Sequence, residues 1–283
     1  MIRMPLYAPL TTICKTLPDD RLSEAFCRGA RRELLLTPKP GLVDVFDNGS
    51  HDDLNLIVMQ QSIDLLPLYY HELMAIPLCP FDSEAVRAIG LAAEERMMIH
   101  CGTNTHKGYV FLSGLVLLAL RCGGDLRHNI RQLSRRLFAD GRQSSHGTAC
   151  RQLYGCTGIV GECLDGLPAL FEQGLPCYRS YRNQGMDETR AALALMGRLM
   201  QVVEDTTSYH RVGMHGATVV RHDGIVLEKR LAAGGEVEDW LVQRNHHYRQ
   251  LNLTMGGVAD ILALTFALDQ LLDEEGLHND KIL

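Results

Sequence analysis

The sequence predicts an all-α protein, and three observations support this. Apolar residues recur at helical spacing through most of the 283 residues. Helix-ending signals, such as Pro38 and the pair Gly123-Gly124, separate the apolar runs. The sequence also lacks internal repeats, low-complexity tracts and any obvious linker. We therefore expect one multi-helix domain over residues 1–283, with loose termini at 1–19 and 276–283.

Each helix is predicted from its own periodicity and end signals. The first places Leu22, Phe26 and Leu34 on one side and stops before Pro38. The expected helices, in chain order, span residues 20–36, 55–74, 83–99 with Ser83 as cap, 104 or 105 to 123, 126–139, 144–155, 163–173, 187–206 with Asp187 as cap, and 256–272.

One stretch departs from the helical pattern. TVVRHDGIVLEK, residues 218–229, places Asp223-Gly224 between β-branched runs, which is a hairpin signal. A surface helix interrupted at the same Asp-Gly pair is the alternative. We expect a short hairpin or irregular excursion here.

Composition limits the kinds of function. The hydrophobic share of 46% and the charged share of 22% are typical of a globular protein. The formal net charge of −6 argues against a nucleic-acid-binding face, so an anionic ligand needs a local cluster of positive groups. Nine cysteines without a C-x-x-C pair suggest a reducing, cytoplasmic setting. The longest apolar stretch, residues 110–120, is too short to span a membrane.

The connection TPKPGLVDVFDNGSHDD, residues 37–53, collects charged side chains beside prolines and glycines. Pro38 and Pro40 hold Lys39 extended, and Gly41 permits a close approach. Two interpretations remain open. The first is a helix stop with an Asx turn and a solvated charge run. The second is a lysine that binds phosphate, with carboxylates that bind Mg²⁺ or a proton; the side chains concerned are Asp44, His51, Asp52 and Asp53.

The stretch GTNTHKG, residues 102–108, precedes the apolar run YVFLSGLVLLAL. Asn104 or Thr105 would suffice as a cap. His106 and Lys107 are unusual in a first helical turn, because the positive end of the helix dipole disfavours cations. An arriving anion would explain them. The stretch therefore predicts either a plain cap or a phosphate site built from Lys107 and the first N–H groups, without a Walker A pattern.

The stretch SSHGTACRQLYGCTGIVGE, residues 144–162, has glycines at positions 155, 158 and 161. The spacing indicates tight packing or a loop against a ligand. It is not G-x-G-x-x-G and no strand precedes it, which disfavours a dinucleotide fold. Glu162 at its end either starts a helix or acts as a base.

Two further stretches bring acidic residues close to glycines. EDTTSYHRVGMHG, residues 204–216, is either a helix C-terminus with a favourably placed Arg211 or a site with Asp205 on a metal and Arg211 on a phosphate. NLTMGGVAD, residues 252–260, has a Gly-Gly pair suited to close packing, and Asp260 lies one turn into the final helix.

Taken jointly, these stretches resemble one family, triphosphoribosyl-dephospho-coenzyme A synthase, from about residue 24 to 270. TPKPGLVD with the later G-S-H-D-D, and G-T-N-T-H-K-G, match its most specific stretches. HGTACRQLYGCTGIVGECLDGLP, EDTTSYHRVG and NLTMGGVADILA match in part its patterns H-G…G-x-R-G-E-A…G-x-P, D-T-N…R-x-G and N-L-S-P-G-G-S-A-D-L-L-A. Members help make the prosthetic group of citrate lyase and malonate decarboxylase.

The resemblance implies a helical fold and an unusual transfer. ATP is attacked at its ribose anomeric carbon, adenine leaves, and the triphosphoribosyl group moves to the 2′-hydroxyl of 3′-dephospho-coenzyme A. A triphosphate calls for Mg²⁺ and for cationic side chains. Cleavage of an N-glycosidic bond passes through an oxocarbenium-like state that a carboxylate stabilises. Implied partners are ATP and 3′-dephospho-coenzyme A, without nucleic acid or membrane, and a homo-oligomer is compatible with the sequence.

Site residues follow as hypotheses from the resemblance. The phosphate or substrate ligands are Lys39, Gly41, Asn104, Thr105, Lys107 and Arg211. The residues for Mg²⁺ or the sugar are Asp44, Asp53 and Asp205. The candidate base is Glu162 or His51, and the candidate acid is His106.

The chain departs from the family pattern at four places. Val160 stands where the pattern has Arg, Thr207 where it has Asn, Met255 where it has Pro, and Val258 where it has Ser. Loss of an arginine removes a bidentate charged contact that valine cannot replace. The departures leave open a divergent member with another acceptor or nucleotide hydrolase activity, and a non-catalytic nucleotide-binding protein.

Overall fold

The computed structural model describes residues 18–139, 150 and 152–274, and over these residues every regular element is helical. The all-α prediction is therefore confirmed. The helices of the described residues are α2 (Asp19–Leu35), α3 (Leu56–Met74), α4 (Ser83–Cys101), α5 (Lys107–Arg121), α6 (Leu126–Phe138), α8 (Gly158–Leu164), the π-helix η1 (Ala169–Gly174), α9 (Leu175–Asn183), α10 (Glu188–Val202), α11 (Thr206–Ala232), α12 (Glu238–Leu251) and α13 (Gly256–Glu274).

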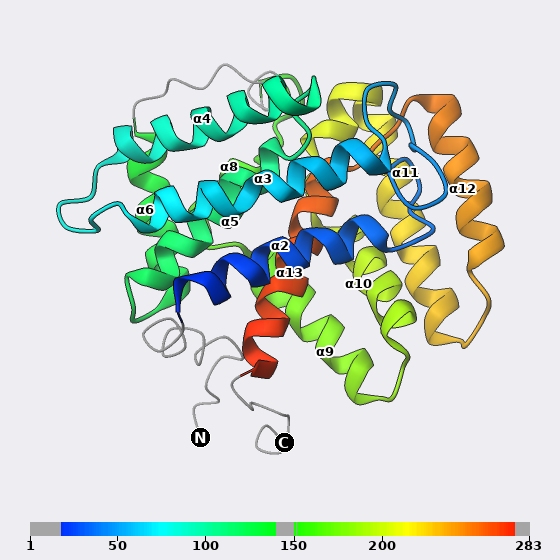
Figure 1. Cartoon of the computed structure of the whole chain (residues 1–283). Helices are drawn as coiled ribbons and strands as arrows, with labels where there is room; N and C mark the ends of the chain where they lie inside the picture. The colour runs from blue at the N-terminus through cyan, green and yellow to red at the C-terminus, as the bar shows by residue number, and fades with distance from the viewer. Residues whose placement is uncertain (1–17, 140–149, 151, 275–283) are drawn as a thin grey trace.

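The centre of the fold is formed by α5 and α13. Residues 112–120 of α5 and 261–269 of α13 are all buried, as expected of helices that are apolar on nearly every face. Gly29 lets α2 lie directly on α13, because a Cβ there would come within 2.4 Å of the Ala263 carbonyl oxygen. Figure 1 shows α2, α3 and α4 side by side, with α13 passing behind α2. The ends of these helices surround the polar loops described below.

Several predicted helix ends agree with the structure. The Asp187 side chain accepts the Arg190 N–H at the start of α10, as expected. The predicted cap Ser83 is wrong by one position, because the side chain of Asp82 accepts the N–H groups of Glu84 and Ala85 in the first turn of α4. No helix of the described ranges combines the length and apolar character that crossing a membrane requires.

The hairpin expected at 218–229 is wrong, since this stretch lies inside α11. Its Asp-Gly pair has a packing role instead of a turn role. Gly224 allows α10 to approach so closely that a Cβ there would lie 2.6 Å from the Gly197 carbonyl oxygen. Asp223 accepts a hydrogen bond from Arg244 of α12 at 2.8 Å. The pair therefore joins α11 to helices on both of its sides.

The prediction for 163–173 is also corrected. Gly166 and Leu167 both have positive φ, and the chain breaks there into α8 and η1. The predicted helix 144–155 falls mostly outside the described residues. Helices α9 and α12 were not predicted; α12 buries only Leu241 and Tyr248, which leaves a weak periodic signal.

Candidate active site

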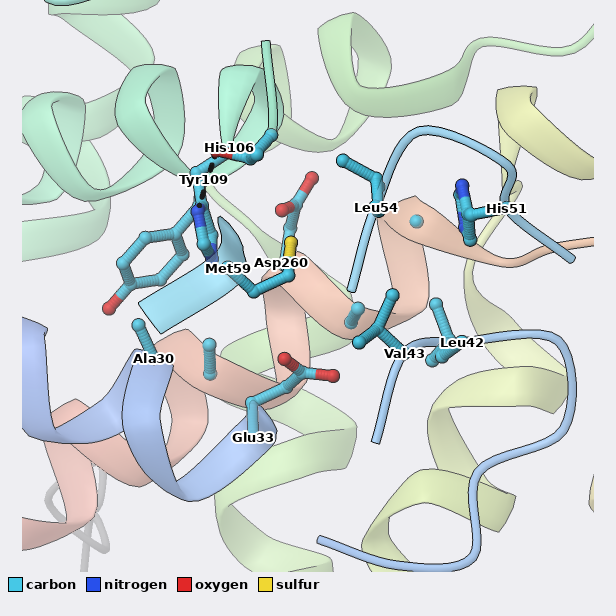
Figure 2. Close-up of a pocket in the computed structure, with 14 residues that line it drawn as sticks. Ala30, Glu33, Leu42, Val43, His51, Leu54, Met59, His106, Tyr109 and Asp260 are labelled. Carbon is cyan, nitrogen blue, oxygen red and sulfur yellow. Dashed lines mark hydrogen bonds between the residues drawn. The ribbon is translucent and has the colours of Figure 1, made fainter. Parts of the chain in front are cut away.

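A small cavity lies where α2, α5 and α13 meet the loop after α2 (Figure 2). Its volume is about 90 Å³. The wall combines apolar side chains with a few polar ones. The polar members are Glu33 from α2, His51 from the loop, Thr105 and His106 ahead of α5, Tyr109 in α5, and Asp260 in α13. We call this the inner cavity.

Asp260 points its carboxyl group into the inner cavity (Figure 2). The carboxyl lies against Gly108, where an added Cβ would come within 1.9 Å of Oδ2. A hydrogen bond from the main-chain N–H of Tyr109, in the first turn of α5, stabilises the ionised form of Asp260. Burial first, and then the negative charges of Asp205 and Glu33, raise the pKa of Asp260 well above its usual range. Within the described part of the chain, no lysine or arginine pairs with it.

Glu33 faces the same cavity but has a cationic partner. The Lys39 ammonium donates to both the carboxylate and the main-chain carbonyl of Glu33, and both side chains are buried. Burial raises the pKa of Glu33, while the charge of Lys39 acts against that rise. The structure thus uses the predicted phosphate ligand Lys39 as the counter-ion of a cavity carboxylate.

His106 is the residue before α5, and its ring is buried. Thr105 donates to the Ser62 hydroxyl, and the Ser62 oxygen lies 2.7 Å from Nδ1 of His106. We assign Ser62 as the donor to Nδ1, which places the ring proton on Nε2. Burial and the charge of Lys39 lower the pKa of His106 to about 4, so the ring is neutral at neutral pH.

A second, open pocket of about 800 Å³ adjoins the inner cavity, and His51 lines both. We call it the outer pocket. Its wall consists of loop residues 47–52 and the C-terminal end of α12 with His246, Arg249, Gln250 and Asn252. Nε2 of His51 lies 3.0 Å from the Thr254 hydroxyl. Burial and the charge of Arg211 lower the pKa of His51.

Two arginines border the outer pocket. Arg249 is half exposed and lies 3.7 Å from the Asp47 carboxylate. Arg211 donates to the Ser50 carbonyl at 3.2 Å and to the Asn252 side chain at 2.5 Å. The structure therefore brings the predicted residues His51 and Arg211 together, although they are far apart in the sequence.

The loop between α2 and α3 is held by its own polar groups. The Asp44 carboxylate accepts the N–H groups of Lys39, Phe46 and Asp47, so the Asx turn of the first interpretation is present, but Lys39 and Asp44 are buried and are not part of a solvated charge run. Gly41 has a φ of 72°, and a Cβ there would lie 2.3 Å from the Leu253 carbonyl oxygen. The predicted close approach at Gly41 is thus an approach to the segment ahead of α13, which orients the loop over both cavities.

Asp205 begins α11, and does not lie in a helix C-terminus as one interpretation had it. Its carboxylate accepts the N–H groups of Thr207 at 2.8 Å, Ser208 at 3.0 Å and Val258 at 3.0 Å, which joins the first turns of α11 and α13. Burial raises its pKa against these three hydrogen bonds. Thr207, Met255 and Val258 all lie at this junction, so three of the four departures from the family pattern are spatially one change.

The three predicted metal ligands do not converge. In the described residues, no group of three or more His, Cys, Asp or Glu side chains is arranged to hold a metal ion. The carboxylates of Asp44 and Asp205 are occupied by main-chain N–H groups. Asp53 is exposed, and its Oδ2 accepts the Thr103 hydroxyl at 2.7 Å. A metal cage made of protein ligands alone is therefore not found there.

Other predicted residues lie around the site without lining the inner cavity. Lys107 is 63% exposed and pairs with Glu94 at 3.0 Å. Asn104 donates to the same carboxylate at 2.9 Å, so it does not cap α5. Glu162, on α8, accepts the Ala169 N–H at 3.1 Å and lines neither cavity; burial raises its pKa. Their functional roles stay predictions.

The predictions from sequence missed Glu33 and Asp260 as site residues. Glu33 lies in a predicted helix among arginines and reads there as part of a solvated face. Asp260 was noted in NLTMGGVAD but given no role. Gly108 was the one sequence feature that pointed to a close neighbour at this place. Only a residue without Cβ leaves room there for the carboxyl group of Asp260.

The helices and their loops converge on a small cavity with two carboxyl groups, which shares one histidine with a wider pocket, and the family of the chain shows that this helical protein is an enzyme. The chain belongs to the CitG family, whose model, described as ATP:dephospho-CoA triphosphoribosyl transferase, matches residues 19–279. This confirms the resemblance seen in the sequence and extends it at both ends.

Known relatives agree with the family. The chain is 34% identical to the 2-(5''-triphosphoribosyl)-3'-dephosphocoenzyme-A synthase of Pectobacterium atrosepticum, over 88% of this chain and 87% of the relative. It is 31% identical to the probable synthase of the same name from Azotobacter vinelandii, over 93% of this chain and 96% of the relative. No solved structure matches the chain.

Proposed function

We propose that this chain transfers the triphosphoribosyl group of ATP to the 2′-hydroxyl of 3′-dephospho-coenzyme A and releases adenine. The observation that carries the proposal is the meeting of the inner cavity and the outer pocket at His51. Transfer at an anomeric carbon needs an enclosed acidic chamber for the glycosidic bond. It also needs a wider pocket with cationic side chains, such as Arg249, for the phosphates.

The inner cavity suits the reacting carbon. An oxocarbenium-like transition state carries positive charge on the ribose ring, and carboxyl groups in a site of low dielectric stabilise that charge. Glu33 and Asp260 both face this cavity. Its 90 Å³ is well below the roughly 300–1,000 Å³ of a usual ligand pocket. Only the reacting ends of the two substrates, the glycosidic bond of ATP and the acceptor hydroxyl, therefore reach into it, and the rest of each substrate lies outside.

The outer pocket suits the phosphates. Its volume of about 800 Å³ falls within the usual range for ligand sites. Guanidinium groups bind phosphate oxygens in a bidentate manner, and Arg249 and Arg211 border the pocket. The exposed Lys107 remains a proposed phosphate ligand, since a phosphate can replace Glu94 as its partner. The buried Lys39 supports the site through Glu33 instead.

We also propose that Mg²⁺ enters with the triphosphate. Protein-bound Mg²⁺ commonly uses one or two carboxylates together with substrate phosphates and water. Asp52, an exposed carboxylate that lines the outer pocket, fits that requirement, and the exposed Asp53 is the next residue along the chain. Asp44 and Asp205 do not fit it, because main-chain N–H groups occupy their oxygens. When bound, the ion would neutralise part of the triphosphate charge.

A cytoplasmic setting and the choice of pathway belong to the same proposal. No disulfide joins the cysteines of the described residues, which suits a reducing compartment. The family name connects the product with the citrate lyase prosthetic group. A homo-oligomer would be detected by light scattering of the purified protein.

The test is a product assay by liquid chromatography and mass spectrometry. Purified protein receives ATP and Mg²⁺, with and without 3′-dephospho-coenzyme A. We expect adenine and the heavier coenzyme adduct only when the acceptor is present. Adenine without the acceptor would instead establish nucleotide hydrolysis. If no adenine forms in either tube while ATP with Mg²⁺ still raises the melting temperature, the non-catalytic nucleotide-binding alternative replaces the proposal.

A further inference from the structure

We propose that Asp260 is the acid that protonates the departing adenine, and that Glu33 is the base that accepts the proton of the acceptor hydroxyl. This assignment rests on the proposed transfer and adds the two proton-transfer groups to it. Both carboxyl groups line the inner cavity, one from α13 and one from α2 (Figure 2).

The different partners of the two carboxyl groups give them opposite roles. Glu33 is bound to the Lys39 ammonium, which favours the ionised form that a base needs. Asp260 lies in the same cavity without a cationic partner in the described residues, which favours the protonated form that an acid needs. Two carboxyl groups whose surroundings separate their titration are the usual arrangement of an acid and a base.

The charges around Asp260 come from every element packed against it. Helix α2 contributes Glu33, α5 and the residue before it contribute Tyr109 and His106, and the start of α11 contributes Asp205. The loop contributes His51 and, behind Glu33, the buried Lys39. Two of these groups are acidic, both imidazoles have lowered pKa values, and the one ammonium is engaged by Glu33. The surroundings therefore keep a proton on Asp260.

The reaction balances with these two groups alone. The bond between ribose C1′ and adenine N9 breaks with its electron pair on adenine, which takes the Asp260 proton at a ring nitrogen. The acceptor 2′-oxygen forms its bond to C1′, and its proton passes to Glu33. One proton then returns from Glu33 to Asp260, so the enzyme ends in its starting state without an oxidant or a further reactant.

His106 is less suited to the acid role that the sequence suggested. Its ring is neutral, and its Nε2 is buried with no hydrogen-bond partner in the described residues. The N–H of a neutral imidazole is a hydrogen-bond donor and a very weak acid. His106 thus positions a substrate acceptor atom, whereas the transferable proton lies on Asp260.

The experiment compares ATP with 7-methyl-ATP, whose positively charged purine leaves without being protonated. The variant is Asp260→Asn, and the control is Asp64→Asn, an exposed carboxyl on α3. We expect Asp260→Asn to lower adduct formation from ATP by about 10²–10⁴-fold, the usual contribution of a general acid. With 7-methyl-ATP the variant should approach wild type, and the control should match wild type with both nucleotides.

An equal loss with both nucleotides would overturn the acid role of Asp260. If wild type forms no adduct from ATP, the proposed function itself fails, so the two failures are distinct. Should Asp260→Asn not fold, the wild-type pH profile decides. Turnover of ATP should fall as rising pH removes the Asp260 proton, and turnover of 7-methyl-ATP should lack that fall.

The variant Glu33→Gln tests the base. It should lose activity with both nucleotides, since a base is needed in each case; rescue by 7-methyl-ATP would contradict the base role of Glu33.

Discussion

Helix α13 carries two aspartates with opposite surroundings, Asp269, which is buried, and Asp260, which is half-buried and lines the inner cavity. Near its C-terminal end, Asp269 lies 2.9 Å from Arg179 and 2.6 Å from Arg182, and Asp273 contacts the same two guanidinium groups. Near its N-terminal end, Asp260 faces the inner cavity with no cationic partner in the described residues. One helix thus holds a fully paired carboxylate and an unpaired one.

The difference teaches which buried charge serves structure and which serves chemistry. Burial raises the pKa of both aspartates, but Arg179 and Arg182 act against the rise at Asp269, whereas Asp205 and Glu33 add to it at Asp260. A buried carboxylate costs free energy unless it is paired. At Asp260 the raised pKa reduces that cost, because a protonated carboxyl carries no charge, and this is the form that the proposed acid role requires.

The largest effect is expected at the paired end. Asp269→Asn should lower the free energy of unfolding by about 3 kcal/mol, because it leaves Arg179 buried with one partner fewer. Denaturant unfolding followed by circular dichroism measures this. Asp260→Asn should lose far less stability, since Asn is neutral like the protonated acid. Equal losses of unfolding free energy in the two variants would contradict the different roles of the two aspartates.

The next effect tests the placement of Asp260. Gly108→Ala should push the carboxyl group aside, because the new Cβ would lie within 1.9 Å of Oδ2. A displacement on this scale costs about 10²-fold in turnover. The matched control is Gly90→Ala in α4, where no atom lies within 4 Å of the new methyl group. Steady-state product formation should fall only in the first variant; unchanged turnover there would show that the carboxyl position is unimportant.

Arg249→Ala tests the outer pocket. Removing a charged hydrogen-bond donor to a phosphate should cost about 1.5 kcal/mol, which is about a tenfold rise in the dissociation constant of ATP. Titration calorimetry measures it. Arg230→Ala is the control, because Arg230 is exposed and stacks on Trp240, away from both cavities. A similar rise of the dissociation constant in both variants would contradict phosphate binding in the outer pocket.

The pH dependence of stability tests the raised pKa of Asp260. The pKa of Asp260 is higher in the folded than in the unfolded chain, so its contribution is complete at low pH and is lost as pH rises through the folded value. Between the two values the loss approaches about 1.4 kcal/mol per pH unit. Unfolding free energies measured from acidic to neutral pH should show this slope in wild type, and a flatter profile in Asp260→Asn.

The smallest stability effect is expected at Lys107. The same variant tests why a lysine begins α5. Lys107→Ala removes an exposed pair with Glu94, worth under about 1 kcal/mol. We expect ATP affinity to fall by more than stability does. Unchanged ATP affinity would make Lys107 the partner of Glu94 and nothing more.

Much of the fold was predictable from local signals, and the exceptions are informative. Asp187 and the run after Lys107 were located correctly because a cap and a helical period are written in neighbouring residues. Asp223-Gly224 was misread as a turn because the same dipeptide also permits close helix packing, and the choice depends on α10 and α12.

The candidate site was predictable in part. The loop with His51, the segment with His106 and the residue Arg211 were recognised as motifs, and the structure brings them to two adjoining cavities. Lys39 was singled out for its charge, yet its partner Glu33 was not. A charged residue shows its type in the sequence, but its partner depends on which helix packs beside it.

The sequence by itself determined that the chain is helical, where most helices begin and end, and to which family it belongs, because periodicity, caps and motifs are properties of neighbouring residues. Only the tertiary structure decided which carboxyl group is paired. Asp269 and Asp260 look alike in the sequence, and they differ because α9 brings two arginines to one while α5 brings a glycine and a cavity to the other.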